Sequence, residues 1–190
     1  PDLIHDTYYN SIKYSNSRAK KIITVHDMNH ELFPDLYLRT DKTSEMKRVA
    51  IKEADHIICV SKNTQKDLLK IFNVNIDKTS VIHLGCSLFV KNKIKNESSD
   101  KPYLLYVGGR DIYKNFSRFI EAYADLDDIK NNYNIIVFSE KLFTQNEFQM
   151  FRRLKINSSN IKIIKGNDLT LAKYYQNASL FVHPSINEGF

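Results

Sequence analysis

The sequence has few of the features that mark several common classes of protein. It contains only two cysteines in 190 residues, Cys59 and Cys86, both in apolar stretches. We predict that both are reduced core residues of an intracellular protein and that no disulfide framework exists. No apolar run approaches the ~20 residues that a membrane-spanning helix needs. The first residues lack a signal peptide and resemble the middle of a protein, so we expect the chain to be part of a longer one.

Motifs for three familiar chemistries are also missing. No Gly-x4-Gly-Lys-Ser/Thr loop is present, which argues against a P-loop nucleotidase. No Ser-His-Asp arrangement with a nucleophile elbow is found. The six histidines do not have the spacing of metal ligands, and we predict no metal site and no cofactor. There is no internal repeat and no low-complexity tract.

The composition is that of an ordinary globular protein with a basic balance. The chain is 42% hydrophobic and 26% charged, and its net charge is +6. A chain of this length can bury a core without disulfides or metals. The positive charge suits an anionic partner, which could be a phosphorylated small molecule, a nucleic acid or an acidic membrane surface. The lysines are scattered rather than clustered, so we do not expect nucleic acid to be the partner.

Seven short apolar runs rich in Val and Ile have the length of buried parallel strands. They are residues 22–25, 57–60, 81–84, 104–107, 135–138, 161–164 and 180–182. Helical spacing is found between them, in residues 45–54, 61–72, 116–126, 146–154 and 169–176. Ser61 is a plausible N-cap of the second of these helices. This alternation predicts an α/β fold with parallel sheets.

A polar segment at residues 91–101 interrupts the alternation. It has no apolar period and is interpreted as a linker. We therefore predict two α/β lobes, at residues 1–90 and 102–190.

The most informative stretch is residues 180–190. An apolar run stops at Pro184 and is followed by Ser185, Glu188 and Gly189. We interpret this as a buried strand that presents Ser185 and Glu188 at its carboxyl end, where ligands bind in open α/β sheets. A solvated loop glutamate is the alternative.

A second constellation follows the strand predicted at residues 104–107. Gly108 and Gly109 allow a tight turn, Arg110 and Lys114 supply positive charge, and a helix begins near Asn115. Glycine permits close approach of backbone to ligand, a helix start attracts anions, and arginine grips phosphate with two donors. These residues predict a diphosphate site. The alternative is a surface turn with two solvated cations.

Two weaker candidates have simple structural explanations as well. His26 and Asp27 follow a predicted strand, and they either face a ligand or are satisfied by loop backbone. The residues from Gly166 through Asn167 to Leu169 lie between a strand and a helix. In that segment Asp168 is expected to be an N-cap as well as a possible ligand contact.

Taken together, these segments resemble the retaining glycosyltransferases of family 4 (glycosyl transferases group 1), which have two Rossmann-like lobes in the GT-B fold. The matching stretches occur in family order. They are residues 25–27, 54–61, 81–86, 103–116 and 175–190, of which the last, Tyr-x-Asn-Ala-Ser-Leu-Phe-Val-x-Pro-Ser-x-x-Glu-Gly-Phe, is the most specific. The resemblance implies the second half of an acceptor-side lobe at residues 1–90. It also implies the first part of a nucleotide-sugar-binding lobe at residues 102–190.

The resemblance also implies roles for individual residues. Arg110 and Lys114 would bind the pyrophosphate of a UDP- or GDP-linked sugar and stabilise the departing nucleoside diphosphate. Glu188 would contact the donor sugar, His26 would face it from the opposite lobe, and residues 166–169 would lie near the base. The acceptor would be a saccharide or a lipid-linked saccharide of a surface polysaccharide, with transfer at the cytoplasmic face of a membrane.

The sequence departs from the family pattern at two points. Arg110 does not directly follow the first glycine, as the arginine does in many members, and the second glutamate of the family's Glu-x7-Glu pair would lie beyond Phe190.

Three other functions remain open. A nucleotide-sugar epimerase has the same fold. A basic nucleic-acid-binding module and a non-catalytic relative that binds a protein are also compatible with the sequence.

Overall fold

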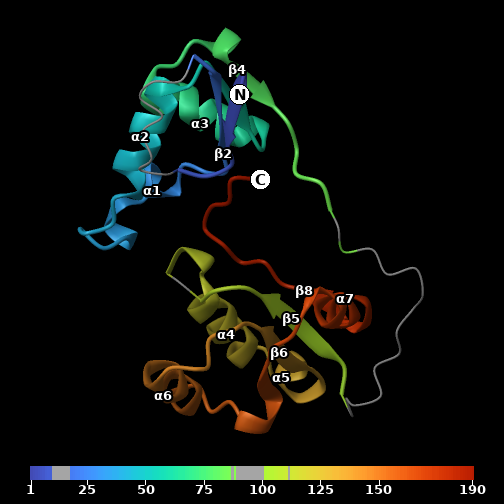
Figure 1. The fold of residues 1–190 in the computed structure, drawn as a ribbon. Coiled ribbons are helices and arrows are strands. Elements are labelled where there is room, and N and C mark those ends of the chain that lie inside the picture. Colours follow the sequence, from blue (N-terminus) through green and yellow to red (C-terminus); the bar gives the residue numbers. More distant parts are fainter. Residues whose placement is uncertain (10–17, 87, 89–100, 111) are drawn as a thin grey trace. The chain divides into compact units, whose positions relative to one another are not determined.

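The computed structural model describes residues 1–9, 18–86, 88, 101–110 and 112–190, and the chain divides into two compact units (Figure 1). Unit 1 comprises Pro1–Gly85 and Asn187–Phe190, and unit 2 comprises Cys86–Ile186. The boundary between the units lies between Gly85 and Cys86, and the last four residues group with the first unit. Apart from Lys101, the predicted linker at residues 91–101 lies outside the described residues.

The described residues of unit 1 contain a parallel sheet of four strands in the order β1-β2-β3-β4. Its strands are β1 (Leu3–Asp6), β2 (Lys20–Val25), β3 (His56–Cys59) and β4 (Thr79–Val81). Its α-helices are α1 (Asn29–Leu32), α2 (Thr43–Glu53) and α3 (Lys62–Phe72), with short 3-10 helices at Pro34–Leu36 and Ile76–Lys78.

The core of unit 1 lies between one face of the sheet and the helices α2 and α3. Ile23 and Ile57 from the strands pack with Ile51 of α2 and Leu68 of α3. The strands follow one another in chain order across the sheet, so right-handed crossovers put both helices on the same face. The predicted N-cap is confirmed, since the Ser61 side chain accepts a hydrogen bond from the Thr64 backbone N–H.

Unit 2 contains, in the part that the structure describes, a second parallel sheet of four strands in the order β7-β6-β5-β8. Its strands are β5 (Tyr103–Val107), β6 (Asn134–Phe138), β7 (Ile161–Ile164) and β8 (Leu180–Phe181). Its α-helices are α4 (Phe116–Asp125), α5 (Asp127–Asn132), α6 (Gln145–Arg153) and α7 (Asp168–Asn177), with 3-10 helices at Ile112–Lys114 and Ser158–Asn160.

Helices cover both faces of the sheet of unit 2 (Figure 1). On one face, Tyr106 and Ile135 pack with Phe119 of α4 and Phe151 of α6. On the other face, Leu105 and its neighbours pack against α7. Strands buried on both faces require near-continuous apolar sequence, which is why the runs in β5 and β6 were recognisable in the sequence.

The strand order of unit 2 reverses at β5. The chain proceeds outward from β5 through β6 to β7, and α7 then returns it to the opposite side of β5 as β8. Such a reversal creates a crevice at the carboxyl ends of the two strands that diverge, and ligands of open α/β sheets bind there. The topology therefore predicts a ligand site at the loops that follow β5 and β8.

Four sequence predictions need correction. The last strand is not buried, because β8 pairs only with β5 at an edge of the described sheet and Leu180 is 59% exposed. The strand predicted at residues 81–84 occupies Thr79–Val81 instead. Cys59 is buried as predicted, but Cys86 is exposed. The residue that caps α7 is Asn167, not Asp168.

Candidate functional site

A pocket of about 320 Å³ opens at the carboxyl ends of β5 and β6 in unit 2. It is lined by Val107, Gly108, Gly109, Phe138, Ser139, Glu140, Lys141 and Leu171. Gly108 has φ of +116°, a backbone conformation that side chains with a Cβ rarely adopt, so a glycine is required at this turn. The pocket lies on the β6 side of β5, whereas the strand order reverses on the β8 side, and both predicted glycines line the pocket.

The loops after β5 and β8 are hydrogen-bonded to each other. The Asn115 side-chain amide donates to the Pro184 carbonyl at 3.1 Å, and the Ile186 backbone N–H donates to the Tyr113 carbonyl at 2.8 Å. These bonds flank Lys114 on one loop and Ser185 on the other. Unit 2 thus places two predicted donor-site residues, which are far apart in the chain, on loops that are joined to each other.

The backbone and side chains of these loops show two further features of a binding site. Asn115 has φ of +58°, an uncommon conformation for a non-glycine residue that is often found at functional sites. The Ser185 hydroxyl is buried and has no hydrogen-bond partner among the described residues. A buried hydroxyl costs free energy when it is unpaired, so a ligand that bonded to it would recover that cost.

Arg110 lies next to this region in a dense set of contacts. Its side chain is 6% exposed and forms an ion pair with Glu147 of α6. Burial alone would raise the pKa of Glu147, but hydrogen bonds from Arg110 and from Thr144 together outweigh it and lower that pKa. Thr144 and Glu147 also form the capping box of α6. The ion pair therefore joins the loop after β5 to the start of α6.

The segment from Gly166 to Leu169 begins α7 as predicted. Asn167 accepts a hydrogen bond from the Thr170 backbone N–H at 3.0 Å, so its side chain acts as the helix cap. Leu169 is 61% exposed. Leu171, two residues further along α7, lines the pocket. The start of α7 therefore forms one wall of the pocket.

The predicted residues of unit 1 follow β2. His26 Nε2 lies 2.8 Å from the Thr7 carbonyl oxygen. Asp27 accepts a hydrogen bond from the Asn29 backbone N–H at 3.0 Å, as in an Asx turn. Both residues therefore have partners in the backbone of loops, which is the simpler of the two interpretations that their sequence allowed.

A buried cation lies beneath this loop. The Lys47 side chain is 0% exposed, and its Nζ donates to Glu31 Oε2 at 2.7 Å and to the Asp27 carbonyl at 2.9 Å. The ring of Tyr9 lies 5.2 Å from the same nitrogen. Burial, and then the nearby Asp27, raise the pKa of the Tyr9 hydroxyl. Lys47 thus holds the loop that carries His26 against α1 and α2.

The last four residues pack within unit 1 next to the same loop. The Gly189 carbonyl accepts hydrogen bonds from the hydroxyls of Ser61 and Thr64. A Cβ at Gly189 would overlap the His26 carbonyl oxygen, so only glycine fits against this backbone. Glu188, which precedes it, belongs to unit 1, whereas Ser185 belongs to unit 2.

Sequence reasoning missed Glu147, Ser139, Leu171 and Lys47. The spacing of Thr144 and Glu147 is that of a capping box, so the helix cap was recognisable in the sequence, but the pairing of Glu147 with Arg110 was not.

Among the described residues, no group of three or more His, Cys, Asp or Glu is arranged to bind a metal ion. None of the helices in the described ranges has the length and apolar character to cross a bilayer.

Family models of known proteins match segments in both units. The family model described as Glycosyl transferases group 1 matches residues 90–190, and the model described as Glycosyltransferase Family 4 matches residues 1–88. The chain is similar to the O-antigen chain mannosyltransferase RfbU of Salmonella typhimurium, with 27% identity over 173 residues. That match covers 88% of this chain and 46% of the relative. The chain thus spans less than half the length of this curated relative.

Two solved structures with the same fold are distant in sequence. WaaG, a glycosyltransferase involved in lipopolysaccharide biosynthesis, superposes with a TM-score of 0.72 at 16% identity, covering 100% of this chain and 55% of WaaG. A mutant of S. aureus TarM, solved with UDP, fondaparinux and α-GlcNAc-glycerol, has a TM-score of 0.68 at 16% identity, and the match covers 92% of this chain and 34% of TarM. These likenesses confirm the predicted α/β fold of the GT-B type.

Proposed function

Because this chain belongs to the Glycosyl transferases group 1 family, we propose that the protein transfers a hexosyl unit from a nucleotide sugar to an acceptor saccharide. The donor is UDP- or GDP-linked, and the acceptor is a saccharide or a lipid-linked saccharide of a surface polysaccharide. The transfer proceeds with retention of configuration and uses side-chain cations in place of a metal. The names of the relatives, which concern O-antigen and lipopolysaccharide, support this class of acceptor.

One observation carries the proposal. The loops that hold Lys114 and Ser185 are joined by two hydrogen bonds at the strand reversal, beside the turn of Gly108 and Gly109. A cation, a buried hydroxyl without a hydrogen-bond partner among the described residues, and a glycine turn that lets backbone approach a ligand suit the diphosphate of a nucleotide sugar.

The proposed chemistry is electrostatic stabilisation of a leaving group. Lys114 balances the charge that develops on the nucleoside diphosphate as the bond to the sugar breaks, a role that preorganised cations fill in water-excluded sites. The segment from Gly166 to Leu169 borders the base, Ser185 bonds to the donor, and Glu188 and His26 contact the sugar. Binding and orientation of the two substrates supply the rest of the rate enhancement.

Calorimetric titration of the full-length enzyme with UDP and with GDP tests the donor site. We expect one of the two to bind, and Lys114→Ala to weaken that binding, because a cation near the diphosphate is lost. A single-stranded oligonucleotide at two salt concentrations is the control for non-specific basic binding. Salt-sensitive binding of the oligonucleotide, with neither nucleotide bound, would contradict the proposal. Epimerisation of the nucleotide sugar without transfer would favour the epimerase.

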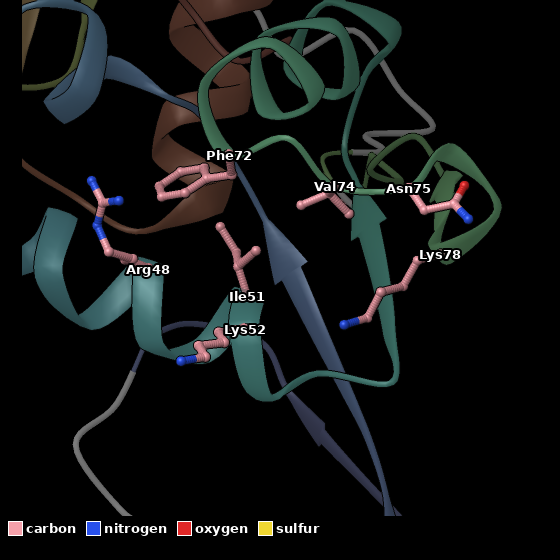
Figure 2. Close-up of a pocket in the computed structure, with 7 residues that line it drawn as sticks. All are labelled: Arg48, Ile51, Lys52, Phe72, Val74, Asn75 and Lys78. Carbon is pink, nitrogen blue, oxygen red and sulfur yellow. The ribbon is translucent and has the colours of Figure 1, made fainter.

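A basic pocket on unit 1 supports peripheral membrane contact (Figure 2). This pocket, of about 390 Å³, is lined by Arg48, Ile51, Lys52, Phe72, Val74, Asn75 and Lys78. Among the described residues, its lining includes three cations, three apolar side chains and no acidic one. The Arg48 guanidinium lies 5.1 Å from the ring of Phe72. The second half of α2, the end of α3 and residues 74–78 form it. It therefore lies near the amino ends of β3 and β4, away from His26, which follows the carboxyl end of β2. We propose that it binds anionic phospholipid headgroups.

Flotation with vesicles tests this contact. We expect the enzyme to float with vesicles that contain phosphatidylglycerol and not with pure phosphatidylcholine. Arg48→Glu/Lys52→Glu should abolish flotation, because each basic residue near an anionic surface contributes about 1 kcal/mol. Lys62→Glu/Lys66→Glu on α3 changes the net charge by the same amount and should retain most of it. Equal losses in the two double variants would indicate attraction by net charge alone.

A further inference from the structure

The hydrogen-bonding capacity of Arg110 is fully used within unit 2. A guanidinium has five N–H donors. The Nε group donates to Glu147 Oε1, Nη1 donates to Ser139 Oγ at 3.2 Å and to the Lys141 carbonyl at 3.1 Å, and Nη2 donates to the Leu142 carbonyl at 2.7 Å and to Glu147 Oε2 at 3.4 Å. Every donor therefore has an acceptor from the protein. A phosphate oxygen could be bound only if one of these bonds were broken.

The positive charge of Arg110 is also balanced locally. Glu147 is 15% exposed, and the Thr144 backbone and hydroxyl groups bond to the same carboxylate. The rings of Phe116 and Phe143 flank the guanidinium at 5.8 and 5.1 Å. An arginine that is paired with a fixed carboxylate and enclosed by aromatic rings contributes little net charge to a neighbouring anion, and removing it from its partner would leave a largely buried carboxylate unpaired.

The groups that Arg110 bonds are those that shape the pocket. Ser139 and Lys141 line it from the end of β6, and Gly109, adjacent to Arg110, lines it from the end of β5. We propose that Arg110 and Glu147 are positioning residues for the donor, and that Arg110 does not bind the diphosphate directly. The pair holds the loops after β5 and β6 at the spacing that the nucleotide requires. This inference rests on the proposed nucleotide-sugar site.

Lys114 occupies a different environment. It ends the 3-10 helix Ile112–Lys114, and its Nζ lies 5.0 Å from the ring of Tyr113. It also lies between Tyr113 and Asn115, the two residues that bond the loop after β8. The structure therefore separates the two cations that the sequence grouped. In this proposal Lys114 binds the phosphates, and Arg110 holds the loops that form the pocket in place.

Inhibition of the full-length enzyme by a nucleoside diphosphate and by its monophosphate tests this division. The pair is UDP with UMP, or GDP with GMP, according to which diphosphate inhibits the unaltered enzyme. The variants are Arg110→Gln, Glu147→Gln and the double variant, with Lys114→Ala as the phosphate control. Thr144→Ala is a second control, because it removes the cap of α6 and keeps the ion pair. The KM values for donor and acceptor are measured alongside.

We expect Arg110→Gln and Glu147→Gln to weaken both inhibitors in parallel, by about 10-fold to 10²-fold, because a displaced loop affects the whole nucleotide. The KM for the donor should rise while the KM for the acceptor stays unchanged, which a merely structural role would not produce. The double variant should be no worse than either single one, since the pair acts as a unit. Lys114→Ala should weaken the diphosphate alone.

Two results would overturn the inference. In the first, Arg110→Gln weakens the diphosphate far more than the monophosphate while Glu147→Gln leaves both unchanged, which is the behaviour of a direct phosphate ligand. In the second, Thr144→Ala matches Glu147→Gln, which would assign the effect to the helix cap. If no nucleotide inhibits the unaltered enzyme, the proposed reaction itself is wrong, and the inference is wrong with it.

Discussion

Replacement of Lys47 by methionine is expected to lower the free energy of local unfolding around β2 and α2 by about 3–5 kcal/mol, the usual cost of removing one partner of a buried ion pair. Lys47 is 0% exposed and Glu31 is 4% exposed. Without the ammonium group, the Glu31 carboxylate would be buried without its cation, and the Asp27 carbonyl would lose a donor. One oxygen of Glu31 already lacks a hydrogen-bond partner among the described residues.

Hydrogen exchange at the backbone amides of α2 and β2 measures this local free energy. Lys52→Met is the matched control, because Lys52 lies on the same helix with its side chain exposed. Its effect should stay within about 0.5 kcal/mol. The variant Lys47→Met/Glu31→Gln should recover part of the loss, since it removes the unpaired charge. If the backbone amides of α2 and β2 were equally protected from hydrogen exchange in Lys47→Met and Lys52→Met, the argument that Lys47 organises the loop of His26 would be refuted.

Replacement of Lys114 by alanine in the full-length enzyme is expected to reduce turnover by about 10²–10³-fold, the scale seen when one preorganised charge-stabilising group is lost. The sequence places Lys114 between a glycine turn and a helix start, and the structure places it on the loop that is bonded to the loop of Ser185. In the proposed mechanism, a cation there acts on charge that develops only as the leaving group departs. The loss should therefore appear in kcat as well as in kcat/KM.

Steady-state kinetics with the nucleotide sugar measure this effect. Arg118→Ala is the control, because it removes an exposed cation from α4, one helical turn further along the chain. We expect it to leave kcat unchanged. A Lys114→Ala variant with unaltered kcat would show that the loop does not stabilise the leaving group, and the diphosphate assignment would then have to be abandoned.

Short-range patterns in the sequence were sufficient to predict the fold class and most of the elements. Strands buried on both faces must be continuously apolar, so β5 and β6 were predicted close to their observed bounds. The helix spacing of residues 116–126 and the cap at Ser61 were equally readable, because both depend on neighbours within a few residues. The tight turn at Gly108 and Gly109 and the helix start near Asn115 could also be predicted, because both depend on residue types within a short stretch of the chain.

Properties that depend on partners distant in the chain became visible only in the folded molecule. The strand β8 coincides with an apolar run in the sequence, yet Leu180 is exposed because β8 lies at an edge of the described sheet. Arg110 and Lys114 lie close together in the sequence and carry the same charge. One is neutralised by Glu147, 37 residues away, and the other lies on a loop that is bonded to the loop of Ser185. Local sequence specifies which groups are present, but long-range packing determines what each of them contacts and therefore what it can do.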